Sequence, residues 1–304
     1  MTAQRHPPSS PLASNRRARF PRGGHPPHVC PTTKDLWRLP MRDLTALPDL
    51  TLALVQTAPV WQDPAANHAH FGALLERAAG ADLVILPEMF STGFSMDAAA
   101  LAEEEDGPSR AWLLAQAARL SAVVVGSVIT RAGDGSYRNR LYWARPDGSC
   151  AHYDKRHLFR MAGEHEHYAA GQERVLLELK GWHVRPLVCY DLRFPVWSRD
   201  PHDTDLLLYI ASWPAARRNA WNRLLPARAI ENLCFVAAVN RVGADGNGYP
   251  HAGDSQVLDF QGEPLLAAGE DDGVFRVTLP AQALAKFRAR FPAWRDADDF
   301  ELKG

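Results

Sequence analysis

From Thr51 onward, short apolar runs alternate with helical patterns, and this alternation constrains the fold more than any other feature of the sequence. The first segments indicate strand, helix, strand, helix and strand, at residues 51–59, 64–80, 82–88, 109–121 and 122–130. This order favours parallel strand pairing, because each helix carries the chain back across a sheet. The run 82–88 is apolar almost throughout, as in a strand buried on both faces.

The second half of the chain changes to hairpin patterns. Residues 136–155 alternate around a Pro-Asp-Gly turn, and residues 175–191 turn near Lys180-Gly181. Further elements are expected as strands at 205–214 and 235–243, a structural turn at 243–248, three strands within 255–279, and helices at 219–234 and 280–291. About ten or more strands exceed one doubly wound sheet. We therefore predict an α/β fold in which two mixed sheets pack face to face with helices outside, a four-layer α-β-β-α sandwich.

Residues 1–47 differ in composition from the rest. The first 40 residues hold seven Lys or Arg, one acid and eight of the 23 prolines. Such a stretch buries too little apolar surface to offset its ordering entropy, so we predict a disordered basic arm over 1–47 and one domain over 48–304. The arm is acid-poor like a transit peptide, although its prolines oppose an amphipathic helix. A third interpretation places the true start of translation at Met41.

The bulk composition is that of an ordinary globular protein. Apolar residues make up 46% of the 304 residues and the formal net charge is −1, so no nucleic-acid partner is expected. No apolar run approaches the ~18 residues that span a bilayer, so no membrane partner is expected either. The four cysteines are widely spaced without a C-x-x-C pair. This spacing favours free thiols in a reducing, cytoplasmic compartment.

The stretch RPLVCYDLRFP, residues 185–195, ends an apolar run in Cys189. The carboxyl ends of strands are where open α/β sheets present ligands, and a helix starting there would help to stabilise a thiolate. The structural alternative is a buried, inert cysteine, which is the usual fate of a free thiol. We expect that alternative for Cys150 and Cys234, while Cys30 lies in the arm.

Three other polar residues stand close to the ends of apolar runs. Glu88 follows a buried strand directly behind a proline, where an acid is costly unless it is paired or faces a pocket. Lys155 ends an expected strand, and Glu164 lies in the stretch AGEHEHY with a second glutamate at Glu166. The alternating acids and histidines there do not match the H-E-x-x-H spacing of a zinc site, so no metal is expected.

A thiol, a lysine and a carboxylate at strand ends form a candidate thiol hydrolase site, which requires a nucleophile, a base and an oxyanion stabiliser. A nearby ammonium is expected to lower the pKa of the thiol. The segments LPEMF, YDKRHLF and LVCYDLRFP, which contain Glu88, Lys155 and Cys189, resemble the nitrilase or carbon–nitrogen hydrolase superfamily. The segments CYDLRFP, SWP, ARAIEN and FPAWRDADDF resemble its bacterial omega-amidase branch. The resemblance runs from about Thr51 to Phe300 and does not include residues 1–47.

The resemblance implies the α-β-β-α sandwich and a role for each residue. Glu88 would be the general base, Cys189 would attack the amide carbon to form a thioester, and Lys155 would stabilise the oxyanion with the backbone N–H of Tyr190. Glu164 would orient the site, with Glu166 as the alternative. No metal or organic cofactor is implied.

The resemblance also implies a small-molecule amide substrate, the omega-amide of a 2-oxo dicarboxylate such as 2-oxoglutaramate, and a homodimer. The far carboxylate calls for a cation. Arg217 or Arg218 is expected to meet it, Arg193 to anchor the loop after Cys189, and Tyr190 and Trp213 to wall the pocket. The alternatives are the same machinery acting on a nitrile, an N-carbamoyl group or another aliphatic amide, and a non-catalytic binding module.

Overall fold

A computed structural model describes residues 42–200, 203–298 and 300–302, all within one unit that spans residues 40–304. The predicted arm, residues 1–47, lies outside the described residues except for its last six. Among those six, Leu44 is buried in the core, and Arg42 forms an ion pair with Asp205.

Two large sheets account for most of the strands. The first has the order β15-β1-β2-β4-β5-β6, with β3 paired to β4. Its strands are β1 (Leu50–Gln56), β2 (Leu83–Ile85), β3 (Glu103–Glu104), β4 (Val123–Arg131), β5 (Tyr137–Ala144), β6 (Cys150–Asp154) and β15 (Gly273–Leu279). Strands β1, β2 and β4 are parallel, as the alternation of strand and helix predicts. The β4–β5, β5–β6 and β1–β15 pairs are antiparallel, so the sheet is mixed.

The second sheet has the order β14-β13-β10-β9-β8-β7. Its strands are β7 (Leu177–Leu179), β8 (Trp182–Val188), β9 (Leu206–Ile210), β10 (Phe235–Val239), β13 (Gln256–Leu258) and β14 (Pro264–Ala267). Here β8, β9 and β10 are parallel and the other pairs antiparallel. A separate two-stranded hairpin, β11 (Val242–Ala244) and β12 (Pro250–Ala252), follows β10.

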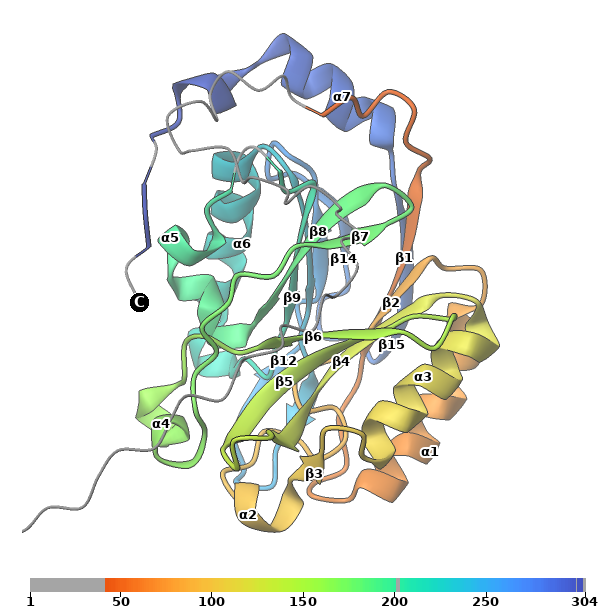
Figure 1. The fold of residues 1–304 in the computed structure, drawn as a ribbon, viewed down its shortest axis with the longest axis vertical. Helices are drawn as coiled ribbons and strands as arrows, with labels where there is room; N and C mark the ends of the chain where they lie inside the picture. The colour runs from red at the N-terminus through yellow and green to blue at the C-terminus, as the bar shows by residue number, and fades with distance from the viewer. Residues whose placement is uncertain (1–41, 201–202, 299, 303–304) are drawn as a thin grey trace, which may run out of the picture. The chain divides into compact units, whose positions relative to one another are not determined.

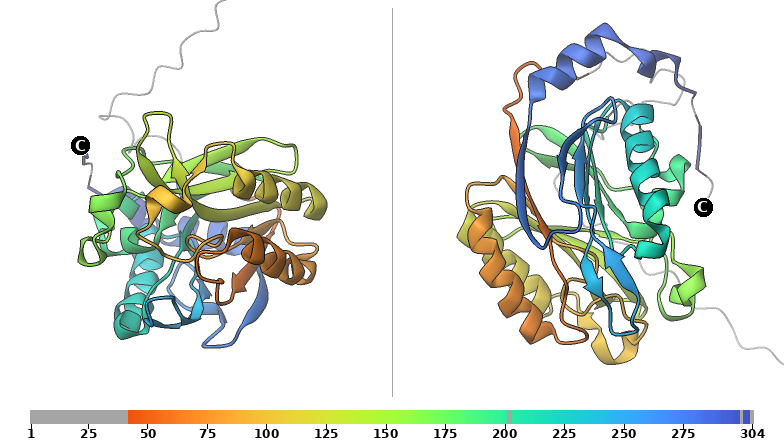
Figure 2. Two further views of the ribbon diagram at one scale, coloured as in Figure 1. Left: turned by 90° about the horizontal axis from the view of Figure 1, so that it is seen from below. Right: turned by 180° about the vertical axis from the view of Figure 1, so that it is seen from behind.

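Helices cover the outer face of each sheet (Figures 1 and 2). The first sheet carries α1 and α3, and the second carries α5 and α6. The helices are α1 (Pro64–Leu74), α2 (Ala98–Leu101), α3 (Pro108–Leu120), α4 (Glu164–His167), α5 (Pro195–Ser198), α6 (Arg218–Asn232) and α7 (Ala281–Arg290). The predicted four-layer α-β-β-α sandwich is confirmed.

Strand alternation divides the core into layers. Leu52 and Leu54 of β1 face the second sheet, whereas Ala53 and Val55 face α1 and α3. This is the period of two that an extended chain imposes on its side chains. The long helix α6 keeps Pro226 in its interior. The proline gives up one backbone hydrogen bond, and the burial of neighbouring apolar side chains such as Trp221 stabilises the helix instead.

The fold brings several strand ends to one place. Glu88 lies in the loop after β2, Lys155 directly after β6, Cys189 directly after β8, and Ser212 two residues after β9. The candidate site is therefore built from both sheets. Within the residues that the structure describes, none of the helices combines the length and apolar character needed to cross a bilayer.

Candidate active site

Cys189 occupies a strained turn between β8 and the 3₁₀ segment at 189–193. Its φ of 45° is unusual for a residue other than glycine, and such strain is often stored at functional sites. The buried carboxylate of Asp191 holds the turn, because it accepts the Val188 N–H at 3.0 Å and the His157 N–H at 2.9 Å. The loop that carries the thiol is thus fixed to the loop that follows Lys155.

Glu88 also lies at a sharp turn, since Met89 has a φ of 49°. The glutamate is 1% exposed, and its two carboxylate oxygens have different partners. Oε1 accepts from Lys155 Nζ at 2.8 Å and from Asn139 Nδ2 at 2.8 Å, while Oε2 accepts from the Ser212 N–H at 2.9 Å. The first sheet therefore binds one oxygen and the second sheet the other.

Lys155 and Glu164 complete a buried charge cluster. The Lys155 ammonium lies 2.9 Å from Glu164 Oε2 and 3.0 Å from Oε1, in addition to its bond to Glu88. All three side chains are fully buried. Glu166, the alternative to Glu164, is exposed and points away toward His165. The structure therefore brings Glu88, Lys155 and Glu164 together and leaves Glu166 outside.

Burial and the neighbouring opposite charges act in opposite directions on the pKa values of Lys155 and Glu164. Burial would lower the pKa of Lys155, but the charges of Glu164 and Glu88 outweigh it and raise that pKa, so the ammonium stays charged. Burial raises the pKa of Glu164, with Lys155 opposing the shift.

The thiol behaves differently from the expectation. Burial, and then the charge of Glu88, raise the pKa of Cys189 well above its ordinary value, while Lys155 lowers it by less. The predicted lowering by the ammonium is therefore outweighed. The resting sulfur is a protonated thiol with a carboxylate and an ammonium as its electrostatic neighbours, so its proton must leave as the sulfur reacts.

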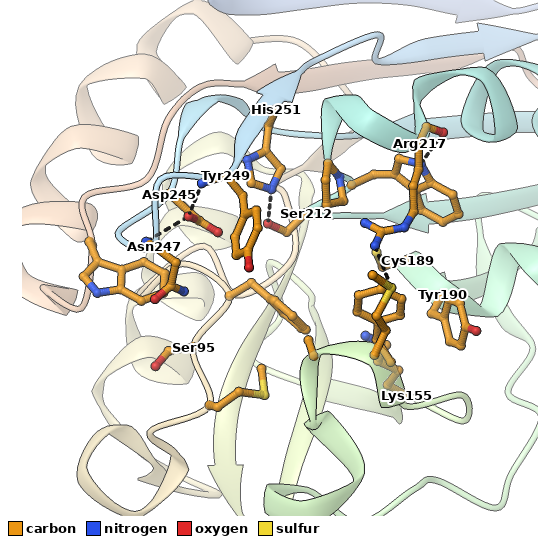
Figure 3. Close-up of a pocket in the computed structure, with 18 of the residues that line it drawn as sticks. Ser95, Lys155, Cys189, Tyr190, Ser212, Arg217, Asp245, Asn247, Tyr249 and His251 are labelled. Atoms are coloured by element: carbon orange, nitrogen blue, oxygen red, sulfur yellow. Dashed lines mark hydrogen bonds between the residues drawn. The ribbon is translucent and has the colours of Figure 1, made fainter.

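Lys155 and Cys189 line a pocket of about 630 Å³ (Figure 3). Lys155, Cys189, Tyr190 and Arg217 lie on one side of it, and Asp245, Asn247 and Tyr249 lie on the other. The predicted wall residues Tyr190 and Trp213 line the pocket, and so does Arg217, which is expected to meet the substrate carboxylate. The Tyr190 ring packs edge-on against the Phe159 ring, with 5.0 Å between the ring centres.

Three arginines expected near the site have different surroundings. Arg193 lines the pocket, with its guanidinium 5.2 Å from the centre of the Trp213 ring, and its expected role as an anchor of the loop after Cys189 stays a prediction. Arg217 lies over the ring of Phe159 and donates to Met161 Sδ at 2.9 Å. Arg218 pairs with Asp254 and Glu270 and is not part of the pocket.

Several residues of the site do not follow from the sequence patterns. Asn139 binds Glu88 from β5, and His251 of β12 contacts Ser212 Oγ at 3.3 Å. Asp245 and Asn247 belong to the turn expected to be purely structural, yet they line the pocket. Only Asn139 has a signal in the sequence. It stands where the alternation of β5 places an inward, apolar position, and a polar residue there needs a partner.

The other cysteines have no such neighbours. Cys234 is fully buried and burial raises its pKa to about 12, while Cys150 is half-buried with its Sγ directed at the Ala151 carbonyl. Cys30 lies outside the described residues. Among the residues that the structure describes, no cluster of three or more His, Cys, Asp or Glu could hold a metal ion.

Comparison with known proteins places this geometry in a family. The model of the carbon–nitrogen hydrolase family matches residues 51–289. Omega-amidase YafV of Escherichia coli K12 is 49% identical over 258 residues, which are 84% of this chain and all of that protein. The 2-oxoglutaramate amidase of Bacillus subtilis is 37% identical over 71% of this chain and 85% of its own length.

Solved structures agree. A CN-hydrolase superfamily protein of Xanthomonas campestris, crystallised with an arsenic adduct in its active site, is 55% identical. It superposes with a TM-score of 0.83 over 84% of this chain and 100% of its own. An amidase of Nesterenkonia with acrylamide added to its active-site cysteine is 28% identical, with a TM-score of 0.71 over 81% and 99% of the two chains. With the family model covering most of its length, this chain belongs to the carbon–nitrogen hydrolase family.

Proposed function

We propose that this protein hydrolyses the omega-amide of small 2-oxo dicarboxylate amides, with Cys189 as the nucleophile. The observation that carries the proposal is the buried Glu88–Lys155–Glu164 cluster beside the Cys189 thiol, at a pocket whose rim bears arginines without carboxylate partners in the described part of the chain. The names of the relatives, omega-amidase and 2-oxoglutaramate amidase, support the same substrate class.

The first half-reaction acylates the sulfur. As Cys189 Sγ attacks the amide carbon, its proton passes to Glu88, the carboxylate that lowers the stability of the thiolate. Charge develops on the carbonyl oxygen, where the Lys155 ammonium and the Tyr190 N–H would stabilise it. The C–N bond then breaks, Glu88 returns its proton to the leaving nitrogen, and ammonia departs from a thioester.

The second half-reaction restores the thiol. Glu88 takes a proton from a water that attacks the thioester carbon, and the C–S bond breaks as the proton returns to sulfur. A 2-oxo dicarboxylate is released. The raised pKa of the thiol favours this return, because a protonated thiol is the stable resting form. Glu164 keeps Lys155 charged and in place through both halves.

Two arginines of the pocket would bind the carboxylate at the end of the substrate away from the scissile amide. Arg193 and Arg217 line the pocket and rest on aromatic rings, and no carboxylate within the described residues forms an ion pair with either of them. Their guanidinium groups are thus available for the carboxylate of the 2-oxo acid, which guanidinium binds in a bidentate manner. Arg218 is excluded from this role by its pairing with Asp254 and Glu270.

The experiment compares ammonia release across amide classes. We expect 2-oxoglutaramate and 2-oxosuccinamate to be turned over far faster than a nitrile, an N-carbamoyl amino acid or an uncharged aliphatic amide. Acid quenching during turnover, followed by mass spectrometry, is expected to find the acyl adduct on the peptide containing Cys189. Faster release from one of the other classes would reassign the substrate, and absence of ammonia from every class would favour a binding module.

We further propose that the protein acts as a homodimer in the cytoplasm. Two exposed apolar side chains support a partner surface, Val196 on α5 and Ile230 on α6, each 52% exposed on neighbouring outer helices (Figure 1). Unpaired cysteines are usual in a reducing compartment. Sedimentation of the purified protein will give the mass, and a monomer at micromolar concentration would contradict the dimer.

A further inference from the structure

Asn139 is the one neutral side chain that bridges the two carboxylates of the charge cluster in the described structure. It lies on β5, is 1% exposed, and donates from Nδ2 to Glu88 Oε1 at 2.8 Å and to Glu164 Oε1 at 3.3 Å. Its backbone carbonyl also accepts the Lys155 N–H at 3.0 Å. One residue thus contacts all three members of the cluster.

The donors of this amide solve an electrostatic difficulty. Glu88 and Glu164 are both buried, and a single ammonium lies between them. Two N–H groups of one amide reduce the repulsion between the carboxylates without adding charge. A second cation in the same place would make Glu88 a weaker base, so a neutral donor suits a glutamate that must accept a proton.

The orientation of Glu88 depends on the same contact. Lys155 has two contacts with Glu164 and one with Glu88, so the lysine alone would hold Glu164 more firmly. The Asn139 amide supplies a second donor on Glu88 Oε1, and the Ser212 N–H fixes Oε2. A carboxylate held at both oxygens cannot rotate away from the thiol.

One atom of the Asn139 amide also destabilises the fold, so stability alone does not account for an asparagine at this position. Asn139 Oδ1 is buried and has no hydrogen-bond partner. An unsatisfied buried acceptor destabilises the fold, and an apolar side chain of similar size would avoid this. Asn139 is not among the residues that line the pocket, and its amide donates to the carboxylates of the cluster instead.

We propose that Asn139 is a positioning residue that holds Glu88 in the orientation from which it accepts the proton of Cys189. The inference rests on the proposed roles of Glu88 and Cys189. It predicts a loss in kcat with little change in KM, because the residue acts through Glu88 and not on the substrate.

The test uses two variants of nearly the same size. Asn139→Leu removes both donors, and we expect kcat for 2-oxoglutaramate to fall about 10–100-fold with KM within about twofold, since a hydrogen bond to a charged group is lost. Asn139→Asp replaces the amide with an acid beside the carboxylates of Glu88 and Glu164 and close to Lys155. We expect it to be less active still at pH 8 and to recover partly toward pH 6, where a protonated carboxyl can donate one hydrogen bond again.

A matched control is Asn232→Leu. Asn232 is equally buried and donates to the Arg228 carbonyl, but it lies at the end of α6 and outside the cluster. We expect this variant to lose thermal stability and to keep the kcat of the folded enzyme. The melting temperature of every variant separates loss of fold from loss of turnover.

Alkylation of Cys189 by iodoacetamide gives a readout that needs no substrate. We expect Asn139→Leu to change the pH dependence of this rate in the same direction as Glu88→Gln. If Glu88→Gln alters it and Asn139→Leu does not, or if folded Asn139→Leu keeps the wild-type kcat, the positioning role is wrong while the proposed function stands. If the wild type releases no ammonia from 2-oxo amides, the proposed function fails instead.

Discussion

The charge cluster, Glu88, Lys155 and Glu164, and the arginine rim of the pocket, Arg193 and Arg217, differ in how their charges are paired. In the cluster, Glu88, Lys155 and Glu164 are fully buried, and the Lys155 ammonium pairs with both carboxylates at 2.8–2.9 Å. At the rim, Arg193 and Arg217 rest on aromatic faces, and no carboxylate in the described ranges pairs with them. The paired charges of the cluster hold catalytic groups in a fixed geometry. The arginines of the rim, unpaired among the residues described, are free to bind a charged ligand.

This difference implies two kinds of mutational effect. A change in the cluster leaves a buried charge unpaired and removes transition-state stabilisation, so it is expected to lower kcat and in some cases stability. A change at the rim removes a contact to one class of substrate and is expected to raise KM for that class alone. The predictions that follow test whether the two regions separate in this way.

The largest effect is expected at the nucleophile. Cys189→Ala removes the sulfur that becomes acylated, so ammonia release from 2-oxoglutaramate should fall by at least about 10⁴-fold while the protein folds normally. The measurement is steady-state ammonia release together with a melting curve. A variant with wild-type turnover would remove Cys189 from the mechanism.

Cys234→Ala is the matched control for that substitution. Cys234 is also a buried thiol with a raised pKa, but it follows α6 and contacts neither carboxylate of the cluster. The small cavity should cost on the order of 1 kcal/mol of stability and leave kcat unchanged. A large loss of kcat here would show that thiol burial, and not the cluster, controls activity.

The next largest effect is expected at Lys155. Lys155→Met keeps the length of the side chain and removes the ammonium, so an oxyanion donor is lost and kcat should fall about 10²–10³-fold. The two buried carboxylates then lack their cation, and one of them should take up a proton. The acid limb of the pH–rate profile is therefore expected to move to higher pH.

Two further measurements keep this prediction testable. If Lys155→Met fails to fold, Lys155→Arg preserves the charge but displaces it, and it should fold with a reduced kcat. An unchanged acid limb in a folded Lys155→Met protein would mean that the lysine does not set the proton affinity of the carboxylates.

The rim should show a smaller and more selective effect. Arg217→Ala removes a partly exposed guanidinium, so kcat/KM for 2-oxoglutaramate should fall about tenfold, mainly through KM. An uncharged aliphatic amide should be turned over as by the wild type. The neighbouring Arg218→Ala is the control, because Arg218 is already paired and lies outside the pocket. Equal losses for charged and uncharged amides would contradict a carboxylate subsite at Arg217.

Much of the fold could be predicted because hydrophobic periodicity determines it locally. The parallel pairing of β1, β2 and β4 and the hairpins β5–β6 and β7–β8 follow the apolar runs and their turns. Glu88, Lys155 and Cys189 were recognisable for a related reason. Each is a reactive residue close to where a buried run ends, and strand ends from two sheets converge in the predicted sandwich.

The remaining site residues depend on geometry that the sequence does not encode locally. Asn139 reaches Glu88 only because the register of β5 against β6 sets it opposite Lys155. Arg193 and Arg217 are each the last residue of a short 3₁₀ segment, and the direction of a side chain there depends on packing with Trp213 and Phe159. The raised pKa of Cys189 likewise follows from burial, which outweighs the lowering of that pKa by the Lys155 ammonium.

The last prediction concerns stability and not turnover, and its subject is His251, which lines the pocket and contacts Ser212, the residue whose N–H holds Glu88. Burial, and then the charge of Arg241, lower the pKa of His251 from 6.5 to about 4. His251 therefore binds a proton below pH ~6.5 in the unfolded chain but only below pH ~4 in the folded protein. The free energy of unfolding consequently decreases as the pH falls through this window. Between pH 7 and 5 the loss from this one group should be about 2 kcal/mol.

His251→Asn removes this titration, so the variant should lose less stability than the wild type between pH 7 and 5, as measured by urea unfolding at both values. The difference between the two pH slopes is the relevant quantity, because other groups titrate in both proteins. Equal slopes would mean that the imidazole is hydrated in the folded protein. The contact between His251 Nε2 and Ser212 Oγ would then not persist in solution.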